Sequence, residues 1–228
     1  MKTFRRPAAI TGAVAALALT LGACGNAEDA GDQNGGQPGA SGQESSSMAP
    51  DSQGGRMKDG VTTADDVFGP GCADVPSDPN DEGSVQGMVD DPVGTAASNN
   101  PLLTKLTAAV KAAGLVDTLN KQDAHYTVFA PADPAFDQLP PKTLKALLED
   151  PSMKKDLQST LTYHVVPKRM DAEELTEAGS VETVQGGKVE IGGSAKAPTV
   201  NGAEVLCGNV PTANATVFVI DKVLQPES

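Results

Sequence analysis

Two histidines and three cysteines are the side chains in this 228-residue chain best suited to nucleophilic or metal chemistry. His125 lies next to charged residues at an expected loop edge, so we expect it to be solvated, whereas His164 falls within an apolar segment with the composition of a strand. A Ser or Cys nucleophile needs a positioned base and a group that orients that base. No Gly-x-Ser-x-Gly elbow, zinc-spaced histidine pair or glycine-rich phosphate loop occurs. We therefore expect no enzyme, no metal site and no cofactor.

The first cysteine, Cys24, follows a segment typical of an export signal. Met1–Arg6 carries three positive charges, and Ala8–Leu21 is uncharged. A helix over that run would span about 21 Å, which is short of the ~30 Å hydrocarbon core of a membrane. Leu21-Gly22-Ala23-Cys24 resembles the bacterial lipobox, in which a diacylglyceryl group is placed on the cysteine and the leader is cut off before it. We expect a lipoprotein signal peptide at 1–23 and lipid attachment at Cys24.

Two alternatives to this interpretation stay open. The leader is also compatible with an ordinary secretory signal and an incidental cysteine. Arg5-Arg6 leaves twin-arginine export possible beside the general route. In either export route the protein would be lipid-anchored on the outer face of the cytoplasmic membrane or in the cell envelope, with partial release conceivable.

The segment after Cys24 has the composition of a tether. Gly25–Gly60 is rich in Gly, Ser, Gln, Asn and Asp and has almost no large aliphatic residues. Such a segment cannot offset the entropy of ordering, so we expect residues 24–60 to form a disordered spacer. Its root-mean-square span would be roughly 35 Å, which suits a spacer that carries a domain through a cell-wall layer.

The net charge is −13, and this charge excludes some partners. An acidic surface repels phosphate backbones, so we expect no nucleic acid partner. Acidic residues also give no electrostatic help in binding anionic lipids. We therefore expect attachment to the membrane through the lipid anchor alone.

Apolar residues recur from Val61 onward, and helical patterns come first. We expect helices or helical turns over Asp91–Asn99, from Asn100-Pro101 to a stop at Gly114, and over Pro134–Leu139, Pro141–Glu149 and Pro151–Leu161. Two strands interrupt this part, over Tyr126–Ala130 and Tyr163–Val166. Asp133 is placed to cap the short helix that follows it.

Short strand-like runs follow and are separated by turn pairs. The runs are Val181–Val184, Lys188–Ile191, Thr199-Val200, Ala203–Leu206 and Thr216–Leu224, and the turn pairs are Gly186-Gly187, Gly192-Gly193 and Asn201-Gly202. Helices followed by a β-meander indicate an α+β fold. We expect a single domain over 61–228.

The remaining cysteines, Cys72 and Cys207, are an even pair in an oxidising compartment if Cys24 carries lipid. A bridge between them would close a loop of about 135 residues. Two free buried thiols are the alternative. Two sulfurs without a nearby histidine do not complete a tetrahedral metal site.

Three ordered motifs resemble those of the fasciclin-domain family. Tyr126–Phe136 (Tyr-Thr-Val-Phe-Ala-Pro-Ala-Asp-Pro-Ala-Phe) resembles the first family signature, Ala215–Leu224 resembles the second, and Tyr163-His164 matches the Tyr-His pair between them. The resemblance covers about Gly69 to Pro226. It is closer to a mycobacterial subgroup of secreted antigens and surface lipoproteins, through Gly69–Cys72, Ser84–Met88, Ala96–Pro101, Leu161–Val166 and Thr212–Thr216, and it implies an actinobacterial source.

The resemblance carries expectations for structure. It implies a twisted β-wedge with packed helices, a Cys72–Cys207 bridge, and a hydrogen-bonded His164 imidazole inside the fold. The signature residues would be mostly structural: Thr127, Val128, Phe129, Ala130, Pro131, Phe136, Tyr163, His164, Val219, Ile220 and Asp221. Asn209-Val210 stands roughly where integrin-binding animal members carry an Asp-Ile type pair, so integrin binding is not carried over.

Two functions are compatible with these features. The first is a cell-surface module for adhesion or binding, whose partner is an extracellular protein or a cell-wall glycan. The alternative is a carrier of a small apolar or lipid ligand between the wedge and the helices, against which the low aromatic content of 3% argues. Asn214-Ala215-Thr216 is a formal N-glycosylation acceptor, which is usually silent in a bacterium.

Overall fold

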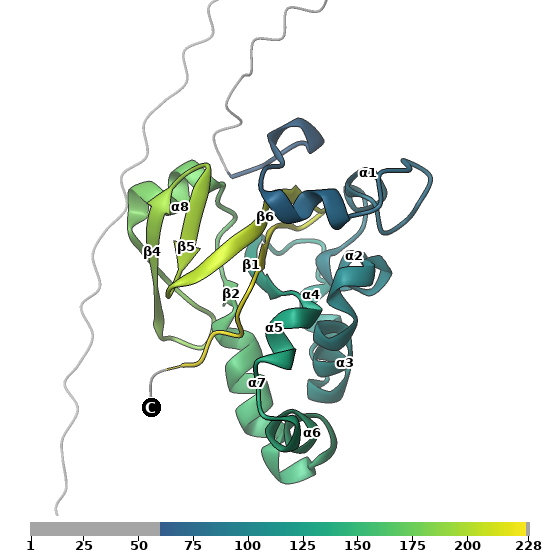
Figure 1. Cartoon of the computed structure of the whole chain (residues 1–228), viewed down its shortest axis with the longest axis vertical. Helices are drawn as coiled ribbons and strands as arrows, with labels where there is room; N and C mark the ends of the chain where they lie inside the picture. Colours follow the sequence, from purple (N-terminus) through teal and green to yellow (C-terminus); the bar gives the residue numbers. More distant parts are fainter. Residues whose placement is uncertain (1–59, 227–228) are drawn as a thin grey trace, which may run out of the picture. The chain divides into compact units, whose positions relative to one another are not determined.

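The computed structural model describes residues Gly60–Pro226 (Figure 1). The predicted leader, Cys24 and the tether up to Asp59 lie outside the described residues. Most helices precede the β-meander, as expected for α+β. They are η1 (Ala64–Asp66), η2 (Pro70–Asp74), α1 (Val85–Met88), α2 (Val93–Asn99), η3 (Pro101–Leu103), α3 (Thr104–Ala113), α4 (Val116–Leu119), α5 (Asp133–Asp137), α6 (Pro141–Glu149), η4 (Pro151–Met153), α7 (Lys154–Tyr163) and α8 (Ala172–Ala178), where η marks a 3-10 helix.

The start and stop signals around α3 are confirmed. The Asn100 side chain accepts a hydrogen bond from the Leu102 N–H at 2.9 Å, and Pro101 opens η3 directly before α3. Gly114 ends α3 with φ +73°, a left-handed conformation that glycine adopts without steric cost. Leu103, Leu106 and Val110 are buried, as their helical spacing predicts.

Seven strands form one sheet in the order β2-β1-β7-β6-β5-β4-β3. They are β1 (Tyr126–Pro131), β2 (Val165–Val166), β3 (Ser180–Glu182), β4 (Lys188–Ser194), β5 (Ala197–Val200), β6 (Ala203–Pro211) and β7 (Ala215–Ile220). The two family signatures pair with each other, because β1 runs parallel to β7 from Tyr126 opposite Ala215 to Pro131 opposite Ile220. The other neighbouring strands are antiparallel.

The two ends of this sheet approach each other and nearly close it. The N–H of Val184, just after β3, donates to the carbonyl of Val165 in β2 at 2.7 Å. This bond joins the chain next to one edge strand to the other edge strand, so the sheet curls into a wedge. Closure protects sheet edges from pairing with other chains.

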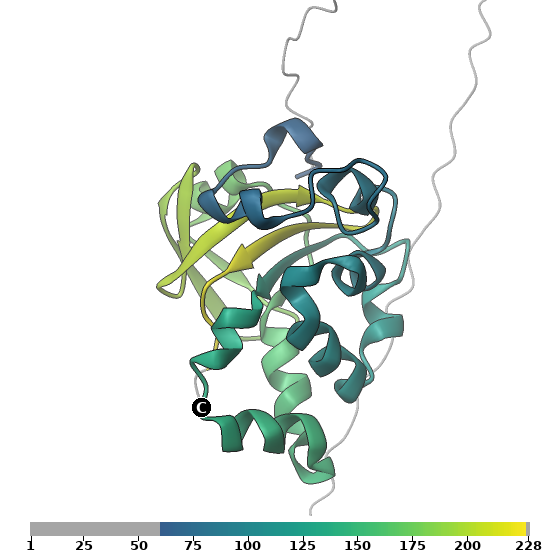
Figure 2. The same cartoon turned by 45° about the vertical axis from the view of Figure 1, so that its right-hand side comes forward.

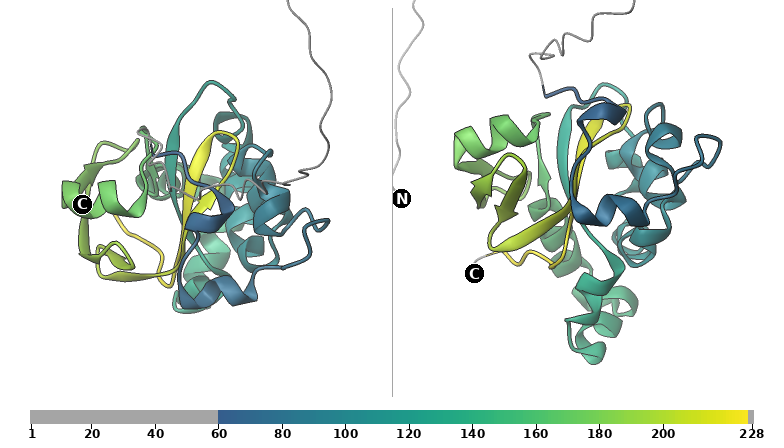
Figure 3. Two further views of the ribbon diagram at one scale, coloured as in Figure 1. Left: turned by 90° about the horizontal axis from the view of Figure 1, so that it is seen from above. Right: turned by 45° about the horizontal axis from the view of Figure 1, so that its top comes forward.

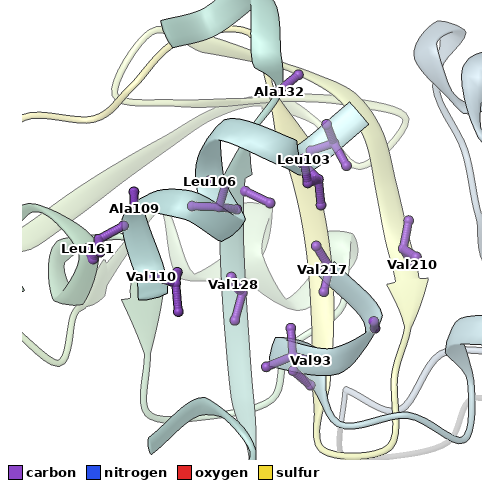
Figure 4. Packing of buried hydrophobic residues seen from close by; sticks show 14 of the residues in the cluster. Val93, Leu103, Leu106, Ala109, Val110, Val128, Ala132, Leu161, Val210 and Val217 are labelled. Atoms are coloured by element: carbon purple, nitrogen blue, oxygen red, sulfur yellow. The ribbon is translucent and has the colours of Figure 1, made fainter. Parts of the chain in front are cut away.

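Side chains alternate between two cores on the two faces of the central strands. Val128 and Val217 point toward the helices, whereas Phe129 and Phe218 point into the wedge. Helices α2, α3 and α7 cover the first face, and α8 with β3–β5 encloses the second (Figures 1 and 2). Figure 4 shows Leu106 and Val110 of α3 directed at Val128 and Val217.

The predicted strand Tyr163–Val166 was wrong at its start. Tyr163 is the last residue of α7 and His164 is its C-cap, so β2 keeps only Val165–Val166. The side chains Leu157 and Leu161 continue an i, i+4 apolar stripe on α7, and both are buried. Tertiary packing of that stripe prevails over the strand propensity of the segment.

The predicted turn at Gly192-Gly193 was also wrong, because both glycines lie inside β4 and the turn falls at Ala195-Lys196. Gly193 has φ +78°, and a Cβ there would lie 2.3 Å from the Ala197 carbonyl oxygen. The pair therefore allows close approach to β5. The Asn201-Gly202 turn is confirmed, with φ +48° and +74°. The last predicted strand is shorter than expected, since β7 ends at Ile220.

Candidate functional site

Cys72 and Cys207 form a disulfide across 135 positions of sequence, as the resemblance implies. Cys72 lies in η2 and Cys207 in β6. The bridge therefore fastens the start of the described chain to the sheet. One antiparallel bridge between Phe68 and Gly208 lies beside it.

The first signature builds the centre of the fold. The Thr127 hydroxyl donates to the Lys168 carbonyl at 2.7 Å and accepts from the Met170 N–H at 2.9 Å. The rings of Phe129 and Phe218 lie 6.0 Å apart at 48°, an edge-tilted arrangement that aromatic pairs favour. Val128 and Ala130 face the helices. Pro131 and Phe136 are also buried.

Tyr163 and Asp221 serve neighbouring strands. The buried Tyr163 hydroxyl donates to the Lys188 carbonyl at 2.7 Å and accepts from the Asn201 side-chain amide at 2.8 Å. The Asp221 carboxylate accepts from the Glu204 N–H at 2.7 Å. Val219 faces the helices and Ile220 the wedge interior, so the second signature is also part of the core.

His164 has both ring nitrogens in hydrogen bonds to the backbone. Nδ1 lies 2.7 Å from the Thr160 carbonyl oxygen and acts as donor, while Nε2 accepts from the Leu224 N–H at 2.9 Å. Burial lowers the pKa of this imidazole from 6.5 to about 4, although the Thr160 carbonyl favours the charged form. The neutral ring holds the C-terminal segment against α7 and is not available to a substrate.

Asp133 does not cap the helix that contains it, which corrects the prediction. Its carboxylate accepts from the Lys105 N–H at 2.8 Å and from the Thr104 hydroxyl, at the N-terminus of α3. The N-cap of α5 is Ala132, which has no side-chain hydrogen bond. Asp133 therefore satisfies an unpaired amide of a helix 28 residues away in sequence.

Asn214 has a structural role that sequence reasoning missed. The buried Asn214 amide accepts from the Val93 N–H at 2.9 Å and donates to the carbonyls of Leu119 and Lys121 at 2.7 and 2.8 Å. This amide ties α2 and α4 to the β6–β7 turn. Its nitrogen is consumed in the folded state, so the formal sequon is closed to modification there.

Arg169, which sequence reasoning also missed, is buried beside the β6–β7 turn. Its guanidinium donates to the Thr216 hydroxyl at 3.2 Å and to the carbonyls of Thr212 and Ala213 at 2.9 and 3.4 Å. Burial lowers the pKa of Arg169. All three acceptors belong to β7 and to the chain between β6 and β7. Arg169 therefore supplies hydrogen-bond donors to the β6–β7 turn.

Gly60, where the described chain begins, is held at the same place. The Thr216 hydroxyl donates to the Gly60 carbonyl at 2.8 Å. Gly60 has φ +66°, and a Cβ there would lie 2.4 Å from the Arg169 carbonyl oxygen. The chain therefore enters the domain at a fixed point beside the β6–β7 turn.

Asn209 and Val210 are engaged inside the fold. The Asn209 side chain accepts from the Ala172 N–H at 2.9 Å in the first turn of α8, and Asn209 has φ +57°. Val210 is 3% exposed. The position that carries the Asp-Ile type pair in some animal members is thus occupied by a residue bonded to the first turn of α8 and by a core residue.

No three side chains among His, Cys, Asp and Glu of residues 60–226 are grouped so as to hold a metal ion. None of the helices in that range combines the length and apolarity needed to cross a membrane. His125 is exposed. The signature residues predicted as site residues are dispersed over both cores, and five of them also line one apolar cavity: Val128, Phe129, Ala130, His164 and Val219.

An apolar cavity of about 80 Å³ lies between the helices and the outer face of β1 and β7. Its wall includes Val110 of α3, Leu119 of α4, Val128 of β1, Leu161 of α7 and Val217 of β7. Several of these side chains are labelled in Figure 4. No single local pattern predicts the cavity, because its wall comes from helices and strands distant in sequence.

A nearly closed seven-stranded wedge with helices on its outer face defines a fasciclin-type fold. The fasciclin domain model matches residues 101–226, and the chain belongs to this family. A solved FAS1 domain pair from the insect cell adhesion molecule fasciclin I shares the fold, with a TM-score of 0.54 at 18% identity. That likeness covers 62% of this chain and 53% of the insect chain.

The chain is also similar to mycobacterial proteins. It is 46% identical to the immunogenic protein MPB70 of Mycobacterium bovis, over 72% of this chain and 84% of that protein. It is 45% identical to the cell surface glycolipoprotein MPB83 of the same species, over 72% of this chain and 74% of that protein. Transforming growth factor-beta-induced protein ig-h3 of Sus scrofa is 37% identical over 54% of this chain, which covers 18% of that protein.

Proposed function

We propose that this chain is a lipid-anchored protein of a bacterial cell surface whose fasciclin domain binds an extracellular protein or a cell-wall glycan. Family membership carries the proposal, because relatives include a cell surface glycolipoprotein and an insect cell adhesion molecule. The lipobox-like leader and Cys24 supply the anchor. Both histidines lack the setting of a catalytic base, since His164 is consumed by backbone bonds and His125 is exposed. These features favour binding over catalysis.

The place where the chain enters the domain leaves one end of it uncovered. The first described residues, drawn in blue, lie at one end of the domain, and α6 lies at the other (Figures 1 and 3). A tether that joins the domain at Gly60 would therefore leave α6 accessible. Unlike α3 and α7, which have comparable lengths, α6 contains no buried residue. We take the outward face of α6 as the contact surface.

The exposed face of α6 carries charged side chains and no aromatic ones. Lys142 and Lys145 are exposed on α6, and Lys145 pairs with Glu149 at 3.8 Å in an exposed ion pair. None of the Phe or Tyr side chains within residues 60–226 is exposed. Recognition on α6 would therefore rest on charged and polar contacts, which salt weakens.

The anchor is tested by replacing Cys24 with Ala in the full-length protein in its own host. Without an acyl chain nothing else predicted in the sequence holds the protein to a membrane, so we expect it in the medium. The measurement is the share of protein in the membrane and culture fractions. Retention of C24A with the membranes would contradict the lipid anchor.

The binding surface is tested with purified protein and two kinds of immobilised material, extracellular protein and cell-wall glycan. Saturable binding to either material identifies the class of partner. We expect K142E/K145E to weaken binding at least about tenfold and added salt to weaken the wild type. E182K/E190K on β3 and β4 is the matched control, since both glutamates are exposed. Equal loss in the control pair would place the contact elsewhere.

The alternative role as a lipid carrier is not favoured by the cavity. Pockets for drug-sized ligands usually hold about 300–1,000 Å³, whereas this cavity holds about 80 Å³. A whole lipid would require the helices to move away from the sheet. Any ligand accepted by the fold as it stands must be much smaller.

A further inference from the structure

The cavity between the helices and the sheet is unusual for a close-packed interior. Protein cores contain few voids larger than a water molecule, because each void loses dispersion contacts. Small side chains such as Ala96 and Ala97 of α2 form part of the wall. Because Ala97 lines the cavity, a larger side chain at this position would occupy part of the space. The sequence nevertheless leaves the cavity open.

The wall of the cavity has almost no free polar group to offer. Most of its buried and half-buried polar side chains already hydrogen-bond their own chain: Asn100, Thr107, Thr162, His164 and Thr212. A buried water needs two to four polar partners. The cavity therefore suits an apolar occupant better than water.

The cavity also reaches the surface. Its wall includes Thr118 of α4 and Val184, both of which are exposed. Val184 is 46% exposed and is one of two large apolar side chains exposed within residues 60–226. Its N–H bond to Val165 holds it beside β2. An apolar side chain thus borders the mouth.

We propose that this cavity binds a small apolar group, which enters beside Val184. An apolar cavity of about 150 Å³ is known to hold benzene or xenon, so about 80 Å³ admits xenon or a few carbons of an aliphatic chain. The source of that group is either a free small molecule or the end of an acyl chain whose remainder lies outside, across Val184. This site is separate from the α6 surface, and neither proposal depends on the other.

The test uses the full chain with methyl labelling and two probes, xenon under pressure and octanoate. We expect saturable shifts of the methyl signals of Val110, Val128, Leu161 and Val217, which line the cavity. Binding of xenon alone assigns the site to free small molecules, and binding of both probes assigns it to the end of an acyl chain. Absence of saturable shifts with both probes overturns the proposal.

Variants locate the site. Ala97→Leu fills the cavity, and we expect it to weaken binding of the accepted probe at least tenfold, whereas Ala108→Leu on the exposed side of α3 binds as the wild type does. Unchanged affinity in folded A97L overturns the proposal. Val184→Ser changes only the exposed rim of the cavity, so it tests the site even if A97L does not fold. If octanoate binds the wild type, V184S should weaken octanoate binding several-fold and leave xenon binding unchanged. An equal loss of affinity for both probes would contradict the assignment of Val184 to the rim.

Discussion

Single buried polar side chains hold the ends of this fold in place, and His164 does so at the C-terminus. Its neutral ring links Thr160 of α7 to Leu224 beyond β7. Protonation would place a second donor against the Leu224 N–H and charge a fully buried ring. The low pKa of about 4 reflects that cost.

The pKa of His164 predicts acid sensitivity. Because the pKa is lower in the folded state than the usual 6.5, the unfolded chain takes up the proton first as the pH falls. The stabilisation is complete above pH 6.5 and is lost toward about pH 4. Between about pH 7 and about pH 5 we expect a loss of about 2 kcal/mol in the free energy of unfolding. Urea titrations of the wild type and His164→Gln measure it as the difference between the two pH profiles.

His125→Gln is the control for this titration, since His125 is exposed. Carboxylates titrate in all three proteins and cancel in the comparison. An H125Q profile that departs from the wild type as much as H164Q does would contradict the assignment to His164.

Asn214 is the second residue whose removal should be costly. Asn214→Ala leaves the Val93 N–H and the carbonyls of Leu119 and Lys121 without their partner. An unsatisfied buried group costs about 1–3 kcal/mol, and of the three bonds only that of the Val93 N–H is fully buried, so we expect a loss of about 1–3 kcal/mol in the free energy of unfolding. Asn80→Ala removes an exposed hydrogen bond to Asp78 within a local turn. It should change the free energy of unfolding by less than about 0.5 kcal/mol. Similar losses in both variants would argue against the role of Asn214.

At the scale of the elements, helix ends are completed by side chains from other elements. Asp133 of α5 caps α3, and Asn209 of β6 accepts from the Ala172 N–H in the first turn of α8, whose own N-cap is Asp171. These bonds lock neighbouring elements to one another as well as satisfying free amides. A helix can therefore depend on a residue that lies far from it in sequence.

Asp133→Ala tests which helix the carboxylate supports. We expect a loss of about 1–2 kcal/mol in the free energy of unfolding, typical of a removed N-cap. Hydrogen exchange should rise at the Lys105 amide and in the first turn of α3. Asp137→Ala, which removes an exposed partner of Lys105, is the control. Faster exchange confined to Ala135 and Phe136 would instead support capping of α5.

At the scale of the molecule, two long-range connections hold the first described residues and the closed sheet together. The Cys72–Cys207 bridge fastens η2 to β6, and the Val184–Val165 bond joins the two ends of the sheet. Closing a loop of 135 residues restricts the unfolded chain much more than a short loop does. The disulfide should therefore contribute strongly to stability.

Removal of the bridge in Cys72→Ala/Cys207→Ala should lower the free energy of unfolding by up to about 5 kcal/mol. Urea unfolding measures the loss, and reductant should have the same effect on the wild type but none on the double variant. Cys24→Ala keeps the bridge and serves as the control. An unchanged midpoint in the double variant would show that the bridge does not stabilise the fold.

Local patterns were sufficient for much of this structure. Asn100-Pro101 and Gly114 mark the limits of the η3–α3 segment, and Asn201-Gly202 is a hairpin turn, because these signals depend on the backbone within a few residues. The meander after the helices indicated α+β on the same basis. The resemblance supplied the pairing of Cys72 with Cys207, which cysteine counting had left open.

Partners distant in sequence were decided only by the tertiary structure. Asp133 caps a helix 28 residues earlier, and Asn214 binds Val93 across 121 residues. Helix α7 extends to Tyr163 because Leu157 and Leu161 are buried on one face of it. His164 is therefore the C-cap of α7 and not part of the expected strand. The apolar cavity likewise exists only where separate helices meet the sheet. Local spacing predicts most of the helix limits and turns, whereas side-chain partners and the exact end of α7 depend on which segments pack together in space.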